Sequence, residues 1–219
     1  MRTIFKGIVF FVCFSFLLPA AKAQIVSGIG IMGGITYSTQ KWKYTEPAEK
    51  LKKKWILRYN GSAFVEFFQH DYLRWVLEAQ YNMKGAKEKT DTGTYRNKLD
   101  YICLNNYLKI RIYDELADFI PYIMLGVRSE YAFKKKPQIY PEIIQHFNPI
   151  HFGWSVGAGV EMVMYGNIKP FAELHYNRDL PVIYAYQKDN LSIINQAFEL
   201  KVGFKYEFFK RKNCPRVYK

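Results

Sequence analysis

Alternation of apolar and polar residues with a period of two is the feature of this sequence that most constrains its fold. Successive side chains of a β-strand point to opposite faces, so the alternation predicts strands with one apolar face. It is clearest over 150–164, where large apolar residues alternate with Gly, Ser, His and Glu. A helical period would bring Lys201 and Lys205 beside Phe198, which argues against a helix there. Eight segments carry the pattern: 27–37, 55–68, 72–83, 99–112, 119–133, 150–164, 168–177 and 195–209.

The connections between these segments alternate in length. Those after the second, fourth and sixth segments are short, at 69–71, 114–118 and 165–167, whereas the other four each exceed a dozen residues. Short turns at one end and long loops at the other are typical of antiparallel barrels of the bacterial outer membrane. Each segment has the roughly 10 residues that a tilted strand needs to cross the hydrocarbon. We therefore expect an all-β protein, an eight-stranded antiparallel transmembrane up-and-down β-barrel.

The composition of the two faces indicates which one points outward. Eight of the ten glycines within the predicted strands lie on the polar face, and small residues fit the concave side of a barrel. The apolar face carries more Trp, Phe, Ile and Leu than an eight-stranded lumen can hold, which argues against a lipocalin-like barrel. Tyrosines cluster near the long loops and phenylalanines near the short turns, as expected of two interfacial girdles. The apolar face should therefore contact lipid.

The first two dozen residues resemble a secretory signal. Two basic residues precede the apolar run 7–18, and Ala21-Lys22-Ala23 fits a cleavage site before Gln24. Twelve apolar residues are too few for a spanning helix. We expect 1–23 to be a cleaved signal peptide, 24–209 the outer-membrane barrel, and 210–219 a basic periplasmic tail.

Charge narrows the choice of partners. The chain has 32 Lys and Arg against 19 Asp and Glu; without Arg2, Lys6 and Lys22, 29 basic residues remain. An exported protein does not meet chromosomal DNA, so we expect no nucleic-acid partner. Nearly balanced charges on the polar face predict an ion-pair network that fills the bore. Its members are Arg58, Glu66, Arg74, Glu78, Lys109, Arg111, Arg128, Glu130, Glu161, Lys169, Glu173, Glu199, Lys201, Lys205 and Glu207.

The excess positive charge lies in the predicted outer loops. Such loops can bind lipopolysaccharide phosphates or acidic glycans, or can simply be solvated. The expected anion-binding residues are Lys41, Lys43, Lys50, Lys52, Lys53, Lys54, Lys84, Lys87, Lys134, Lys135 and Lys136.

Catalytic groupings on the lumen side are few. His175 and Glu173 share a face of one predicted strand, and strand pairing brings Ser155 near His175. Ser, His and Glu can together deliver a nucleophile and its base, but polar residues are required at every lumen position and will meet by chance. We expect a non-enzymatic protein with no cofactor. No metal-ligand spacing links the histidines, so no metal site is expected. Cys103 and Cys214 are expected at different heights and unpaired.

Three stretches resemble the PorT-like outer-membrane β-barrel family. They are 76–87 (VLEAQYNMKGAK), 98–109, and 195–208, which is similar to the closing strand of that family. Asn105-Asn106 departs from the Ile-Pro usual in the fourth strand, and Cys103 stands where Glu is usual. The resemblance implies a small structural barrel. The family's namesake takes part in type IX protein secretion, which implies secretion-machinery proteins as alternative partners.

Three functions therefore stay open at this point. The first is a surface or envelope-integrity barrel that acts through basic loops. The second is an accessory component of a type IX-like secretion or envelope-assembly machine. The third is a lipid-modifying enzyme.

Overall fold

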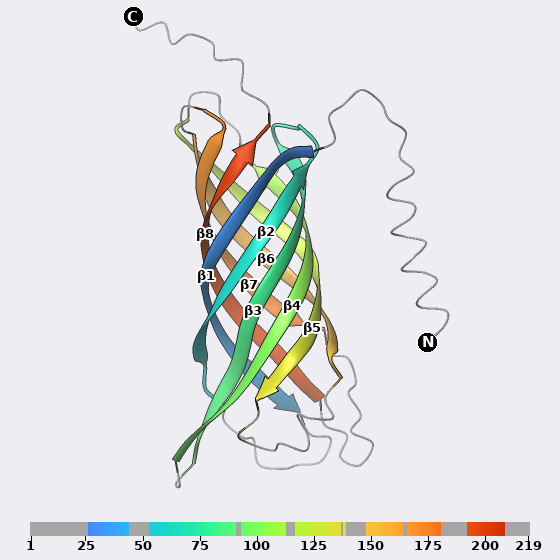
Figure 1. Ribbon diagram of the computed structural model, residues 1–219, viewed down its shortest axis with the longest axis vertical. Coiled ribbons are helices and arrows are strands. Elements are labelled where there is room, and N and C mark those ends of the chain that lie inside the picture. The colour runs from blue at the N-terminus through green and yellow to red at the C-terminus, as the bar shows by residue number, and fades with distance from the viewer. Residues whose placement is uncertain are drawn as a thin grey trace, which may run out of the picture.

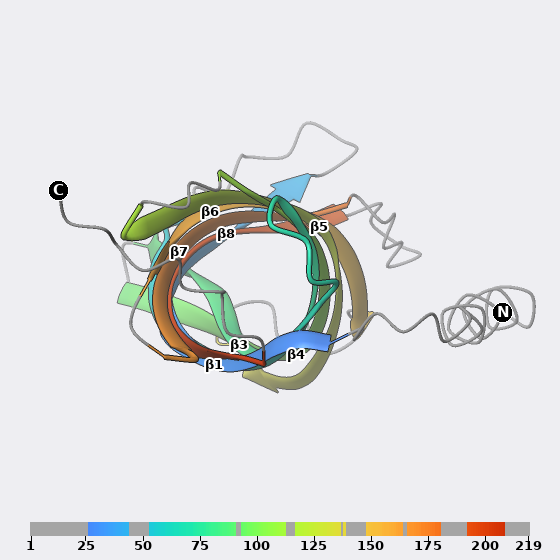
Figure 2. The same cartoon turned by 90° about the horizontal axis from the view of Figure 1, so that it is seen from above.

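A computed structural model describes residues 26–43, 53–90, 93–112, 117–136, 138, 148–163, 166–180 and 192–208. These residues form one closed antiparallel barrel in which every strand pairs with its neighbours in sequence and β1 pairs with β8 (Figure 1). The strands are β1 (Val26–Lys43), β2 (Ile56–Phe67), β3 (Leu73–Thr90), β4 (Gly93–Arg111), β5 (Phe119–Lys136), β6 (Ile150–Met162), β7 (Ile168–Asp179) and β8 (Ser192–Glu207). The predicted eight-stranded fold is confirmed, and Figure 2 shows the closed ring from above. No helix in the described part of the chain has the length and apolar character of a membrane span.

The two ends of the barrel differ in their connections. The short connections 68–72, 112–118 and 163–167 define a turn end, and the opposite end is the loop end. At the turn end Gly166 has a φ of 109°, a backbone conformation that glycine adopts without steric cost.

One predicted loop is absent. The long connection expected after the third strand is only 91–92, because β3 and β4 stay paired from Leu73↔Ile110 to Thr90↔Gly93. This hairpin projects beyond the rest of the barrel at the lower end of Figure 1. Its outer part is polar on both faces, so backbone pairing continues where the apolar alternation stops. β1, β5 and β8 also run several residues farther toward the loop end than predicted.

Side chains on the two faces follow the predicted orientation. Large apolar residues point outward and are exposed, with Ile31 at 67%, Val127 at 63% and Tyr59 at 68%. Polar and charged residues of the opposite face are buried. A surface this apolar around the whole ring is suited to a hydrocarbon environment rather than to water.

Inward glycines let neighbouring strands come close. A Cβ on Gly126 would lie 2.2 Å from the carbonyl oxygen of Asn106 and 2.4 Å from Cδ1 of Tyr107. A Cβ on the outward Gly61 would meet nothing nearer than 3.9 Å. The bias of glycine toward the polar face therefore reflects crowding inside the barrel.

Candidate functional site

The bore near the turn end holds a group of ion-paired side chains, which we call the turn-end cluster. Glu66 is central to it: its carboxylate lies 2.8 Å from Arg74 Nη1, 2.8 Å from Lys109 Nζ and 3.0 Å from Lys205 Nζ. Glu161 also pairs with Lys109, and its carboxylate lies 2.7 Å from Lys205 Nζ. The full cluster is Glu66, Arg74, Lys109, Arg111, Glu161, Lys169, Lys205 and Glu207, with Arg111 on Glu161 and both Arg74 and Lys169 on Glu207. It contains five cations and three carboxylates, all buried.

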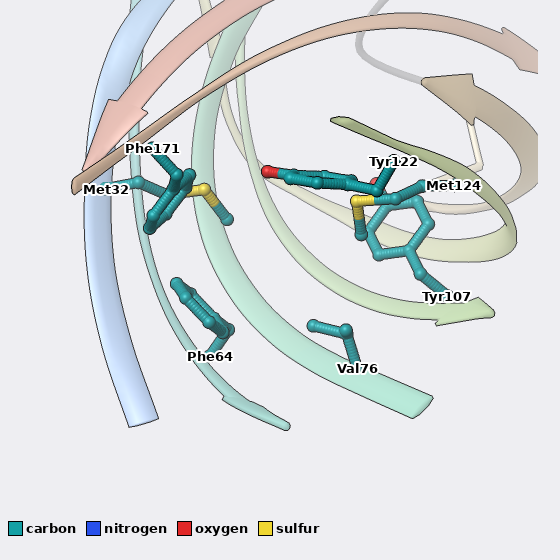
Figure 3. Close-up of a cluster of buried hydrophobic side chains, with 7 residues drawn as sticks. All are labelled: Met32, Phe64, Val76, Tyr107, Tyr122, Met124 and Phe171. Carbon is teal, nitrogen blue, oxygen red and sulfur yellow. The ribbon is translucent and has the colours of Figure 1, made fainter. Parts of the chain in front are cut away.

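An apolar plug lies next along the bore (Figure 3). Val76 lies between Arg74 and Glu78 along β3, and Tyr107 lies between Asn105 and Lys109 along β4. The plug consists of Met32, Phe64, Val76, Tyr107, Tyr122, Met124 and Phe171. Phe64 and Phe171 meet edge to face with centroids 5.5 Å apart, a favourable aromatic geometry. This plug was not predicted from the sequence, although apolar residues at inward positions, such as Phe64 between Ser62 and Glu66, indicate it.

A second set of ion pairs, the loop-end cluster, follows on the other side of the plug. Lys201 Nζ lies 2.8 Å from Glu78 and 3.3 Å from Glu199. Arg128 bridges Glu130 at 2.9 Å and Glu199 at 3.3 Å. The cluster is Glu78, Lys84, Arg128, Glu130, Glu199 and Lys201, three cations and three carboxylates. Gln80 and Asn82 donate to the Glu199 carboxylate as well, so the buried charges are both paired and hydrogen-bonded.

Lys84 corrects one prediction. It was expected on an outer loop among the anion-binding lysines, yet it is 1% exposed and its Nζ lies 2.7 Å from the Glu130 carboxylate. The inward alternation of β3 continues past Asn82 to Lys84, beyond the predicted end of the strand. The expected role in anion binding is therefore wrong for this residue.

Two further buried aspartates pair with inward-facing residues. Asp179 is buried; it lies 3.6 Å from His151 Nδ1 and accepts a 2.6 Å hydrogen bond from Asn195. Asp100 is on the outward face of β4, but it is buried and lies 2.8 Å from Nη1 of Arg58, close to where the β2–β3 ladder ends, so it serves as the counter-ion of Arg58. With Lys84, Asp100 and Asp179 added to the fifteen predicted residues, cations and carboxylates number nine each. Fourteen of those fifteen are buried, and Arg58 is partly exposed.

The structure brings the Ser/His/Glu group together. Ser155 Oγ lies 3.4 Å from His175 Nδ1, and Glu173 Oε2 lies 2.8 Å from His175 Nε2. Tyr122 donates a 2.7 Å hydrogen bond to the same carboxylate. All four side chains are buried, and the His175 ring packs on Gly157, where a Cβ would lie 2.5 Å from Nδ1. Because all four side chains are buried in the described part of the bore, the group resembles packed polar side chains rather than a site that a lipid substrate can reach.

The remaining basic residues expected to bind anions lie in different settings. Lys50 and Lys52 are outside the described residues, and only the backbone of Lys43 is described. Lys53 is largely buried and pairs with Glu88. The others lie at the loop end: Lys41, Lys54, Lys134 and Lys136 are exposed, and Lys87 and Lys135 are half-buried.

The described residues were predicted to hold neither a metal ion nor a disulfide, and their His, Cys, Asp and Glu side chains bear on both predictions. Within those ranges no group of three His, Cys, Asp or Glu side chains is arranged to hold a metal ion. Cys103 is a buried free thiol, and Cys214 lies outside the described part of the chain.

Comparison with known families identifies the barrel. Residues 22–181 match the family described as outer membrane protein β-barrel domain. The chain belongs to this family. Its barrel therefore resides in the bacterial outer membrane, with the apolar outward face against lipid. A search of curated proteins finds no significant match.

Solved structures share the fold at low sequence identity. The outer membrane protein OprG from Pseudomonas aeruginosa is similar with a TM-score of 0.60 and 13% identity, covering 86% of this chain and 99% of OprG. Neisserial surface protein A is similar with a TM-score of 0.51 and 13% identity, covering 84% of this chain and 99% of that protein. At this identity the likeness supports the fold alone.

Proposed function

We propose that this protein is a non-enzymatic outer-membrane barrel with a sealed bore, which acts in surface interaction or envelope integrity through its basic loop end. The observation that carries the proposal is the sequence of layers inside the bore: the turn-end cluster, the apolar plug and the loop-end cluster. A cavity beside the plug, lined by Met32, Phe64 and Val76 among others, offers about 10 Å³ to water, the space of about one molecule.

The charge balance supports a structural role for the bore. Nine cations and nine carboxylates leave no net charge to select an ion, and both clusters use their carboxylates on several cations at once. Eight-stranded barrels have room for side chains but not for an aqueous channel. We therefore assign the function of the protein to the surface that it exposes outside the bore, at the loop end.

A deletion strain tests the proposal. Loss of the gene should raise sensitivity to a large antibiotic such as vancomycin, and the wild-type gene should restore resistance. Unchanged permeability together with an unchanged set of surface-bound ligands would contradict the proposed role.

The PorT-like resemblance supports a second candidate, an accessory role in type IX-like secretion. The segments at 76–87, 98–109 and 195–208 carry that resemblance; the first two lie in β3 and β4, and the third lies along β8 and extends one residue past Glu207. Comparing secreted proteins of the deletion strain and its parent separates the candidates: collapse of a class of cargo supports secretion, and an unchanged secretome supports the surface barrel.

The contacts among Ser155, His175 and Glu173 support a third candidate, a lipid-modifying enzyme. This candidate requires that the lipid A of the cell change when the gene is lost. Mass spectrometry of lipid A from strains carrying wild type, Ser155→Ala or no gene provides the test. Lipid A that changes on deletion and is restored by wild type but not by Ser155→Ala would establish the enzyme. Identical lipid A in all three strains would exclude it.

Export is part of the proposal as well. Residues 1–23 are proposed to be removed before Gln24, with 24–209 forming the barrel and 210–219 a periplasmic tail. N-terminal sequencing of the protein from outer membranes should begin at Gln24; a first residue of Met1 would contradict cleavage.

A further inference from the structure

Basic side chains gather on the outward face of β3, β4 and β5 at the loop end. Directly opposed residues of adjacent strands share a face, and the register pairs Lys54 with Lys87, Lys87 with Arg96, and Lys98 with Lys136. Lys134 of β5 lies opposite Asp100, which is on the same outward face of β4 as Lys98. We call this set the basic patch: Lys54, Lys87, Arg96, Lys98, Lys134 and Lys136.

A β-bulge in β5 creates part of the patch. The β4–β5 register passes from Tyr101↔Ala132 to Asp100↔Lys134, so Phe133 is the extra residue. The bulge changes the alternation of β5, so that Lys134 and Lys136 point outward after Phe133. Without it, Lys135 would take the outward position between two inward lysines.

Carboxylates in the described part of the chain leave the positive charges of the patch unpaired. Within the described residues, no carboxylate lies within ion-pair distance of the patch side chains. Among the described residues, the acidic residue opposite the patch is Asp100, which is already engaged by Arg58 at 2.8 Å and by the hydroxyl of Tyr81 at 3.3 Å. Like charges directly opposite each other on neighbouring strands destabilise a sheet, so this arrangement favours an external anion.

The position of the patch indicates where that anion lies. The lipid-facing surface between the patch and the middle of the barrel is aromatic. Tyr81 and Phe133 are in ring contact there, with centroids 5.8 Å apart, and Tyr131 is half exposed. Such aromatic residues mark the boundary between hydrocarbon and headgroups. Lys136 follows Phe133 by three residues, about 10 Å along the strand, and long basic side chains extend to the polar layer.

We propose that the basic patch binds the phosphates of lipopolysaccharide headgroups in the outer leaflet. This inference rests on the proposed surface role and names its partner. A lipid headgroup is favoured over a soluble anion because the patch continues the lipid-facing side of β3–β5, beside the aromatic residues, and extends along the projecting hairpin (Figure 1).

The test uses the full exported chain in detergent micelles with two probes, diphosphorylated lipid A and the same lipid with both phosphates removed. Native mass spectrometry gives the apparent Kd for each. Wild type should bind the phosphorylated lipid more tightly. Lys98→Gln with Lys136→Gln should weaken that binding about 30-fold, since each basic residue near an anionic surface contributes about 1 kcal/mol and 1.4 kcal/mol is tenfold.

A matched control removes two basic residues from other strands of the loop end, Lys41→Gln with Arg178→Gln, and should change the Kd less than threefold. Should the first pair fail to give a heat-modifiable barrel, Lys134→Gln with Arg96→Gln replaces it. Equal binding of both lipids, or equal loss in patch and control variants, would overturn the inference. Displacement of lipid A by 50 mM inorganic phosphate, or tighter binding to a heparin fragment than to lipid A, would overturn it in favour of a soluble anion.

This outcome is separable from the proposed function. A failed lipid-binding test removes the partner and leaves the permeability of the deletion strain unaffected. A failed permeability test removes the envelope role and leaves the measured lipid affinity in place.

Discussion

Replacing Glu66 by glutamine should destabilise the barrel far more than replacing its partner Lys205 by methionine. Glu66 is completely buried, and side-chain nitrogens of Arg74, Lys109 and Lys205 lie within 3.0 Å of its carboxylate oxygens. Both substitutions keep the approximate size of the side chain and remove one charge. They differ in the sign of the charge that is removed.

The expected magnitudes follow from the contents of the turn-end cluster. Five cations share three carboxylates there, so Glu66→Gln leaves five against two and strands buried positive charge. Removing one partner of a buried ion pair costs about 3–5 kcal/mol. Lys205→Met leaves four against three, and Lys109 still pairs with both Glu66 and Glu161. The large cost of breaking a buried ion pair comes from the uncompensated charge left behind. Because Glu66 and Glu161 both keep Lys109 as a partner, we expect a cost below about 2 kcal/mol.

Urea unfolding in phosphatidylcholine vesicles, followed by tryptophan fluorescence, measures the difference in free energy of unfolding. Asp71→Asn at the exposed turn end serves as the control and should change stability by less than about 0.5 kcal/mol. If Lys205→Met costs as much as Glu66→Gln, the charge accounting of the turn-end cluster is wrong.

Four further substitutions probe packing, each measured by urea unfolding and by the heat-induced mobility shift on a denaturing gel. Phe171→Ala should cost about 3–5 kcal/mol, because it empties the plug opposite Phe64; a cost under about 1 kcal/mol would mean that the plug is loosely packed. Gly126→Ala should prevent folding since its Cβ would meet a carbonyl oxygen at 2.2 Å, whereas Gly61→Ala should be tolerated; equal behaviour of the two would refute the crowding argument. Gly166→Ala should cost about 1–2 kcal/mol through its φ of 109°, and a neutral result would indicate that the turn relaxes.

The sequence predicts the barrel well where each strand meets lipid on one side. Over 150–164 the alternation gave β6 within two residues, because hydrocarbon and bore impose opposite demands on successive positions. Above the membrane both faces meet polar surroundings. The outer half of the β3–β4 hairpin and the inward position of Lys84 therefore escaped prediction.

The sequence predicts which charged residues point into the bore, but it does not predict their division into a turn-end cluster, a plug and a loop-end cluster. Alternation assigns Glu66 and Lys205 to the bore, yet which side chains meet depends on the stagger of the barrel, which one strand does not reveal. The plug and the bulge at Phe133 were missed for the same reason: each is defined by neighbouring strands. The placement of Ser155 beside His175 was foreseen because it needs the register of a single hairpin.

Conductance in planar lipid bilayers tests the central claim, a barrel sealed by two ion-paired clusters and a plug, most directly. The folded full chain, checked by its heat-induced mobility shift, is inserted and recorded in 1 M KCl beside a known porin. We expect no discrete conductance steps above those of protein-free bilayers. Reproducible steps of porin-like size would contradict the sealed bore and would turn attention to transport.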